Sequence, residues 1–192
     1  MTDQNRCLST RERLISAATT LFHRAGVHAT SVDEIAATAG VTKPTLYRHF
    51  PGKEDVVVAC LEAEGLLRRQ ALTSAVEASS GPAARIRAIG RHFARDLGDA
   101  PDRGLLSLSV SVEFPEADGR VRTAIRAQAQ ALQDLLAALI APDQPQAAGP
   151  VAQQLILAIC GASAGVRALG PTAADSLVGC VEAIIASADL RA

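Results

Sequence analysis

The sequence has few of the residues from which proteins build cross-links and metal sites. Four cysteines lie far apart in 192 residues, with no C-x-x-C pair among them, and the four histidines do not cluster with them. The cysteines are Cys7, Cys60, Cys160 and Cys180. The spacing therefore predicts no disulfide framework, no metal site and no cofactor.

The sequence also lacks the patterns of an enzyme. It shows no paired carboxylates and no Gly-rich phosphate loop. An enzyme would have to use Cys60 or Cys160 as a nucleophile with a histidine as its base, and the spacing does not support that arrangement. Redox sensing by Cys160 and Cys180 is a further alternative, but no pattern of neighbouring cations activates either thiol. We therefore expect a protein that binds rather than catalyses.

Long apolar runs are missing as well. Met1–Arg13 is polar and charged, which predicts neither a secretory signal nor a membrane anchor at this end. The most apolar stretch, Leu155–Val166, contains Gly161, Ser163 and Gly165 and falls short of the roughly 20 residues that span a bilayer. The sequence thus predicts a cytoplasmic protein without a membrane partner, in which this stretch is a buried or partner-facing helix.

Acidic and basic residues are nearly balanced overall but not along the chain. The net charge is −1. Residues 1–53 carry seven Lys and Arg against four Asp and Glu, whereas the remaining residues carry twelve against sixteen. An excess of positive charge at one end of the chain is typical of a nucleic-acid contact.

Helical spacing of apolar residues, separated by Pro and Gly, runs through almost the whole chain. It predicts an all-α fold of about nine helices. We expect Thr172 to cap the last helix and Asp143–Gly149 to form an exposed connection. The expected helices cover residues 9–25, 32–38, 43–50, 53–76, 82–97, 106–112, 119–140, 150–169 and 172–187.

Residues 106–112 have an ambiguous pattern. Leu, Ser and Val alternate strictly along this segment, and alternation by itself predicts a strand. No second segment with a strand pattern exists for it to pair with, and an unpaired strand leaves a row of backbone groups without partners. We therefore predict a helix here.

Ser31–Phe50 has the features that a helix-turn-helix needs. Ser31 and Glu34 are spaced as a capping box, which starts a first short helix. Gly40 suits the left-handed backbone of a tight turn. Thr42 is an N-cap residue for a second short helix, in which Leu46 and Phe50 point to the core. A pair of short packed helices with solvated charges is the alternative.

The outward side of that second helix carries the candidate DNA contacts. Pro44, Thr45, Arg48 and His49 face outward, and the first two offer a methyl-binding surface and a hydroxyl to base edges. Two flanking residues, Lys43 and Tyr47, are long enough to reach phosphates. A cation at the start of the next helix, Lys53, opposes the helix dipole, and a bound phosphate would explain its place there.

These residues also resemble a known family. Thr30–Val32, Ala39–Val41 and Thr45–Phe50, followed by Lys53 and Glu54, look like the TetR family of regulators over residues 14–60. The resemblance implies an all-helical homodimer with an N-terminal three-helix DNA-binding domain (1–53) and a larger domain (54–192) for effector binding and dimerisation. The positions that correspond to the family's DNA contacts are Thr42, Lys43, Pro44, Thr45, Tyr47, His49 and Lys53.

Two sets of residues in the larger domain are candidates for its partners. Apolar faces of the last two helices suit self-association, with two recognition helices about 34 to 36 Å apart; they comprise Leu155, Ile159, Ala162, Val166, Val178, Val181 and Ile185. Aromatic, apolar and polar side chains suited to a small-molecule pocket comprise Phe93, Leu108, Ser111, Phe114, Ile125 and Gln128. Both sets also fit the ordinary core of a monomer.

The sequence thus predicts a DNA-binding transcriptional regulator. In the leading hypothesis a homodimer represses from a palindromic double-stranded operator and is released by an unknown small-molecule effector, with a coupling of about 1 to 3 kcal/mol. The alternatives are a helical protein whose short helices contact another protein, and an activator built on the same scaffold.

Overall fold

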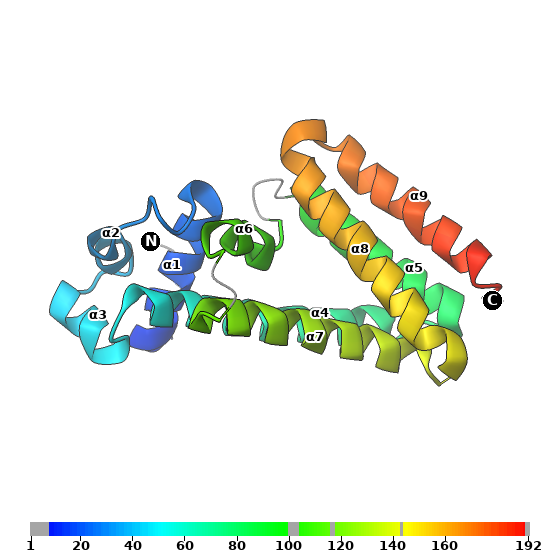
Figure 1. Cartoon of the computed structure of the whole chain (residues 1–192), viewed down its shortest axis with the longest axis horizontal. Coiled ribbons are helices and arrows are strands. Elements are labelled where there is room, and N and C mark those ends of the chain that lie inside the picture. The colour runs from blue at the N-terminus through cyan, green and yellow to red at the C-terminus, as the bar shows by residue number, and fades with distance from the viewer. Residues whose placement is uncertain (1–7, 100–103, 116–117, 143, 191–192) are drawn as a thin grey trace.

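The computed structural model describes residues 8–99, 104–115, 118–142 and 144–190, and the regular secondary structure within them is all helix, with no strand (Figure 1). The all-α prediction is therefore confirmed over these residues. Their nine helices are α1 (Thr10–Ala25), α2 (Val32–Thr38), α3 (Lys43–His49), α4 (Lys53–Val76), α5 (Pro82–Asp99), α6 (Leu106–Glu113), α7 (Arg120–Ile140), α8 (Pro145–Leu169) and α9 (Thr172–Ser187).

The helices form two groups joined by a long pair. Figure 1 shows α1, α2 and α3 at one end, α5, α8 and α9 at the other, and α4 and α7 running side by side between them. A first core is built from α1 to α3, the first half of α4, α6 and the start of α7, and a second from the end of α4, the second half of α7, α5, α8 and α9. Val56, Val57 and Leu61 of α4 belong to the first core, and Leu72 and Val76 belong to the second, so α4 contributes to both cores.

Segment 106–113 is a helix, as predicted against its alternating pattern. Leu106 and Val110, four residues apart, are fully buried in the first core, which a helix achieves by placing them on one face. The hydroxyl of Ser111, which follows Val110, donates to the carbonyl of Leu108, so this serine is satisfied within its own helix. The burial of Leu106 and Val110 on one helical face thus determines the conformation of this segment, despite its alternating sequence pattern.

The start of α8 differs from the prediction. The helix begins at Pro145, so most of the expected connection Asp143–Gly149 is helical, while Asp143 itself lies outside the described residues. Pro150 stands inside the helix and removes a hydrogen bond to the carbonyl of Gln146, but Gln146 is exposed and water can serve that carbonyl. Buried Ala148 fixes this first turn to the second core.

Smaller differences affect helix ends. Helix α9 has Pro171 rather than Thr172 at its N-cap, and no side chain caps it. The third helix ends at His49 with Phe50 as its C-cap, and α5 continues two residues past Leu97. Such ends are the least constrained parts of a helix because they lack four intrahelical bonds.

Helix α8 is the one described helix that is long and apolar enough to cross a membrane, by length and composition. A third of its most apolar window is buried inside the chain (33%). Val151, Leu155 and Ile159 pack into the second core. We therefore interpret α8 as a core helix whose other face is open to a partner.

The turn after α1 depends on Gly26. Its φ is +84°, and a Cβ there would lie 2.9 Å from a carboxylate oxygen of Glu113. We expect Gly26→Ala to lower the free energy of unfolding by about 1 to 3 kcal/mol, because it adds strain in the left-handed region and displaces Glu113. Urea unfolding measures this. Gly98→Ala in α5, where the added Cβ meets nothing within 4 Å, is the control and should not destabilise the protein.

Candidate nucleic-acid interface

Helix α2 is held at its start by the predicted capping box. The hydroxyl of Ser31 accepts from the backbone N–H of Glu34 at 3.1 Å, and the Glu34 carboxylate accepts from the N–H of Ser31 at 2.7 Å. Ile35 and Ala36 are buried against the first core. Two of the free N–H groups at the helix start are thus satisfied, which makes so short a helix stable where it lies.

The turn follows at once. Gly40 has a φ of +66°, and the N–H of Val41 donates to the carbonyl of Ala36 at 2.9 Å, which closes the end of α2. Thr42 then begins α3 as its N-cap, its hydroxyl 3.4 Å from the N–H of Thr45 and 2.9 Å from the Thr45 hydroxyl. Leu46 of α3 is fully buried, so this helix is fixed against the first core on one side only.

The other side of α3 is open to solvent. Of the eight residues that the sequence assigns to DNA, five are exposed: Thr42, Lys43, Pro44, Tyr47 and Arg48. Three are half-buried: Thr45, His49 and Lys53. All eight lie on α3, at its N-cap or at the start of α4, so they are grouped at one end of the molecule (Figure 1). Their contact with DNA stays a prediction.

Lys43 already has a partner on α2. Its Nζ lies 3.0 Å from a carboxylate oxygen of Asp33, and both side chains are largely exposed. The hydrogen bond to Asp33, with the attraction of that charge, raises the pKa of Lys43 above its usual value. Lys43 therefore carries its charge at neutral pH, but a phosphate has to compete with Asp33 for it.

We expect Asp33→Asn to strengthen binding to DNA of any sequence. Removing the carboxylate frees Lys43 and removes a repulsion toward phosphates, and a single exposed charge contact changes affinity by about two- to fivefold. Fluorescence anisotropy with random duplexes at two salt concentrations measures it. Asp134→Asn, the same change of charge on distant α7, should leave affinity unchanged. Weaker binding of Asp33→Asn would contradict this role for Lys43.

Lys53 has a structural contact that the sequence does not reveal. Its Nζ donates to the backbone carbonyl of His28 at 3.4 Å, which ties the start of α4 to the loop after α1. This contact gives Lys53 a structural reason for its place at the helix start besides the phosphate that the sequence predicts. A long hydrogen bond to one carbonyl leaves two ammonium protons, so a phosphate contact by Lys53 remains a proposal.

One further cation near this surface escapes the sequence analysis. The guanidinium carbon of Arg11, on α1, lies 5.1 Å from the centre of the Phe50 ring at the end of α3. This places an exposed positive charge beside the end of α3. No sequence spacing relates two residues 39 positions apart, so this neighbour is found only in the fold.

The six residues proposed for an effector pocket do not come together. Phe93 is buried in the second core, and Phe114 stacks on the ring of His28 with centres 5.4 Å apart. Leu108 packs against the second core, whereas Ile125 packs against the first. Ser111, already described, bonds within α6. Of the six, Gln128 alone lines a pocket that the structure shows, which corrects the set.

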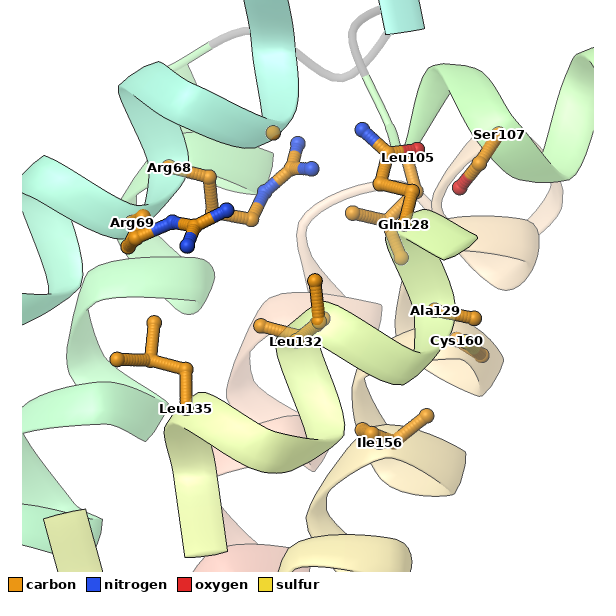
Figure 2. Close-up of a pocket in the computed structure, with 12 residues that line it drawn as sticks. Arg68, Arg69, Leu105, Ser107, Gln128, Ala129, Leu132, Leu135, Ile156 and Cys160 are labelled. Atoms are coloured by element: carbon orange, nitrogen blue, oxygen red, sulfur yellow. The ribbon is translucent and has the colours of Figure 1, made fainter. Parts of the chain in front are cut away.

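That pocket lies between α4, α6, α7 and α8 (Figure 2). It encloses a cavity of about 60 Å³. A shallower hollow of about 270 Å³ adjoins it and shares Gly65, Arg69 and Gln128 with it. The walls of the first cavity are mainly apolar, with two arginines of α4 on one side. It is lined by Gly65, Arg68, Arg69, Leu105, Ser107, Gln128, Ala129, Ala131, Leu132, Leu135, Ile156 and Cys160.

The residues proposed for self-association also need correction. Six of the seven are buried within this chain: Leu155, Ile159, Ala162, Val166, Val181 and Ile185. Val178 alone is exposed (38%). The six pack into the second core, where a partner chain has no access to them, because α8 and α9 turn this face toward α5 and α7. A surface for self-association on these helices therefore has to use their opposite sides.

The thiols of Cys60 and Cys160, the two nucleophile candidates, are poorly suited to nucleophilic chemistry. Burial raises the pKa of the Cys60 thiol to about 12, and its sulfur lies 3.6 Å from the carbonyl oxygen of Ile15. Burial also raises the pKa of Cys160, against a lowering by Arg68. The three described cysteines are free thiols, and Cys7 lies outside the described residues. A protonated thiol is a weak nucleophile at neutral pH.

Known proteins resemble this chain in both sequence and fold. A family model described as bacterial regulatory proteins, tetR family, matches residues 14–60, which contain α2, the turn and α3. The HTH-type transcriptional regulator LmrA of Bacillus subtilis is 37% identical over 79 residues, or 41% of this chain and 42% of that protein. The HTH-type transcriptional activator FasR of Mycolicibacterium smegmatis is 31% identical over 127 residues, or 66% of this chain and 58% of that protein.

The fold similarity extends further than the sequence similarity. A crystal structure of a TetR-family transcriptional regulator from Streptomyces coelicolor matches with a TM-score of 0.84 and 29% identity, over 93% of this chain and 95% of that one. The chain spans about two fifths to three fifths of the curated relatives named above. The family model thus covers the helix-turn-helix end, the sequence relatives cover up to two thirds of the chain, and the fold similarity covers nearly all of it.

Proposed function

Because the chain belongs to the TetR family of bacterial regulatory proteins, we propose that it regulates transcription by binding DNA through α3. In this proposal a homodimer binds a palindromic operator, represses the adjacent gene, and is released when a small molecule occupies the pocket between α4, α6, α7 and α8. The relative FasR is named an activator, so the sign of regulation is part of what has to be tested.

The observation that carries the proposal is the division of α3 into a buried and an open side. Leu46 is completely buried and Phe50 nearly so, whereas Thr42, Pro44 and Tyr47 have no role in the core. A helix held in this way presents its first turn and its flanking cations outward, as a recognition helix does in a major groove. The excess of positive charge in residues 1–53 supports the same use.

A dimer is proposed on the open side of α8 and α9. This surface, which we call the small-residue face, consists of exposed Leu157, Gly161, Ala164 and Ala168 on α8 and Gly179, Ala183 and Ala186 on α9. A Cβ added at Gly161 or Gly179 meets nothing within 4 Å in this chain, so another helix can approach closely there. Four helices, two from each chain, then form a two-fold interface.

Helix α6 is the proposed connection between the pocket and the DNA-binding end. Its start lies at the pocket, which Leu105 and Ser107 line. Its end holds the loop after α1: the Glu113 carboxylate accepts from the backbone N–H of Val27 at 2.8 Å and from that of His28 at 2.5 Å. A shift of α6 caused by an occupant is thus passed to the loop that precedes α2.

Glu113 gives this connection a pH dependence. Burial, the largest influence, raises the pKa of Glu113, but the hydrogen bonds from the backbone of His28 and Val27 and from the His28 ring hold it below the usual 4.5. A lowered pKa in the folded state means that the charged carboxylate stabilises the fold above pH 4.5. This stabilisation is lost as the pH falls through the folded-state value.

We expect Glu113→Gln to lower the free energy of unfolding at pH 7 by about 1 to 3 kcal/mol, because hydrogen bonds from two N–H groups to a carboxylate are weakened. The difference from wild type should shrink below pH 4.5, where the native carboxyl becomes protonated. Urea unfolding across this range measures it, with exposed Glu77→Gln as the control. A difference that does not depend on pH would contradict the charge-assisted contact.

The experiment that tests the proposed function is selection of bound fragments from random DNA, followed by anisotropy titration of a selected fragment. We expect a palindromic sequence and a stoichiometry of two chains per fragment. A reporter gene placed behind that sequence then gives the sign of regulation. Failure to enrich any sequence, with a protein that is folded, would contradict the proposal.

A further inference from the structure

The pocket between α4, α6, α7 and α8 contains a cation that its surroundings do not fully pair. Arg68 has a side chain that is only 18% exposed, and within the described residues its one carboxylate neighbour is Glu64, at 3.7 Å. That separation is longer than a hydrogen bond. The guanidinium carbon of Arg68 lies 5.9 Å from the centre of the Phe93 ring. The ring attracts the positive charge but does not accept the paired hydrogen bonds that a carboxylate accepts.

The opposite walls are apolar. Leu132 and Leu135 come from α7 and Ile156 from α8, and Figure 2 shows them across the pocket from the two arginines of α4. A pocket with apolar walls and one enclosed guanidinium is complementary to a molecule with an apolar body and an acidic group. Arginine binds carboxylates through two parallel hydrogen bonds, and does so most strongly where water is excluded.

A polar oxygen of the pocket also lacks a partner. The amide nitrogen of Gln128 donates to the carbonyl of Leu61 at 2.7 Å, which fixes the orientation of the side chain. Its Oε1 is then buried without a hydrogen bond. A buried acceptor without a partner is unfavourable by about 1 to 3 kcal/mol in general, and water is the donor that satisfies it alongside an anionic ligand, which has only acceptors.

Arg68 is also connected to the DNA-binding end. Glu64, its carboxylate neighbour, contacts the Nε2 of His23 on α1 at 2.5 Å, and the His23 side chain is nearly buried. The second oxygen of Glu64 has no hydrogen bond and is buried. An acid that enters the pocket therefore competes with Glu64 for Arg68, and Glu64 is one of the residues that join α4 to α1.

We propose that the pocket binds a small amphipathic acid, with its anionic group on Arg68 and its apolar part against Leu132, Leu135 and Ile156. The inference deepens the proposed function, on which it rests, by giving the chemical class of the effector. The cavity of about 60 Å³ fits a compact molecule rather than a drug-sized one, which would need several hundred. The competition with Glu64 gives the acid a direct effect on a contact of the DNA-binding end.

The test uses three probes of equal length and different charge: hexanoate, hexanamide and hexylamine. Calorimetric titration of the full chain without DNA should show hexanoate binding at least about tenfold more tightly than hexanamide, with hexylamine no tighter than hexanamide. Equal binding of all three, or a preference for the amine, would overturn the inference. Neither outcome depends on whether the protein binds DNA.

Two variants with the same loss of charge locate the acid. In Arg68→Gln the preference for hexanoate over hexanamide should fall to about twofold or less, whereas Arg69→Gln, at the exposed neighbour, should retain most of it. Glu64→Gln should bind hexanoate a few-fold more tightly, because the competing carboxylate is gone. A preference that persists in Arg68→Gln would overturn the role of Arg68, and Arg68→Met, which also removes the charge, serves if that variant does not fold.

The same preparations separate this inference from the proposed function. DNA binding is measured by anisotropy with no hexanoate present. If the protein binds a selected fragment but does not distinguish hexanoate from hexanamide, the proposed regulatory function is supported and the acid-binding pocket is refuted. A protein that distinguishes the probes but enriches no DNA sequence refutes the regulator instead.

Discussion

Gly161→Glu should convert the protein to a monomer and lower its affinity for a palindromic fragment by about 100- to 10,000-fold. The affinity falls because each DNA-binding end then has to find its half-site independently, without the high effective concentration that a linked partner provides. Gly161 is exposed at the middle of the small-residue face, with open space around it. In a two-fold interface the new carboxylates from both chains would be brought together without cations to pair them.

The substitution should not harm the fold of the single chain. Glutamate favours a helix interior more than glycine by about 0.5 to 1 kcal/mol, and nothing within 4 Å obstructs the new side chain. Light scattering after size-exclusion chromatography measures the mass, and anisotropy measures the affinity. Gly98→Glu, an equally open glycine in α5, is the control and should stay dimeric. A Gly161→Glu dimer with normal DNA affinity would place the interface elsewhere.

Tyr47→Phe should weaken binding to a palindromic fragment by about 30- to 1,000-fold. A charge-assisted hydrogen bond to a phosphate contributes about 1 to 2 kcal/mol, and a symmetric dimer loses two such bonds. Tyr47 is 45% exposed on the open side of α3. The ring remains in the variant, so only the hydroxyl is removed. Because phosphates carry no sequence information, the loss should be similar for selected and scrambled duplexes.

Anisotropy titration with both duplexes measures this loss, and Val112→Ala is the control. Val112 is 81% exposed on α6 and belongs to neither the DNA-binding residues nor the small-residue face. It should therefore leave both affinities unchanged. If Tyr47→Phe lowers affinity for the selected duplex alone, Tyr47 contacts bases; if it changes neither, α3 does not meet DNA in the proposed orientation.

The sequence predicts the DNA-binding end well because local interactions determine it. Ser31 and Glu34, Gly40 and Thr42 act on neighbours within a few residues, and each does in the structure what its spacing indicates. Such caps and turns are readable because their partners stand at fixed separations along the chain. The same holds for the bounds of α4, which agree with the prediction at both ends.

The larger domain is less predictable because its helices are apolar on more than one side. On α8 the faces through Leu155 and through Leu157 are both suited to packing, and only the position of α5 and α7 decides which belongs to the chain's own core. Periodicity identifies faces but not their partners. Periodicity alone therefore predicts a dimer through the buried face, whereas a second chain has access to exposed surfaces such as the small-residue face.

The lining of the pocket is not predictable from the sequence for a related reason. Phe93 and Phe114 are candidates because aromatic residues are rare in this sequence. In the structure, however, Phe93 is part of the core and Phe114 contacts His28. Arg68 reads in the sequence as an ordinary solvated cation, and only the fold encloses it between helices that are distant in the chain. A residue's chemistry is visible in the sequence, but its burial depends on contacts across the whole domain.

The most direct test of DNA reading by α3 is the ratio of affinities for a selected palindromic duplex and a scrambled one, measured by anisotropy over a range of salt. The account predicts a ratio of about 1,000 or more at physiological salt, with both affinities falling steeply as salt rises because phosphates are contacted by cations. Equal affinities for the two duplexes, or affinities that do not respond to salt, would contradict it.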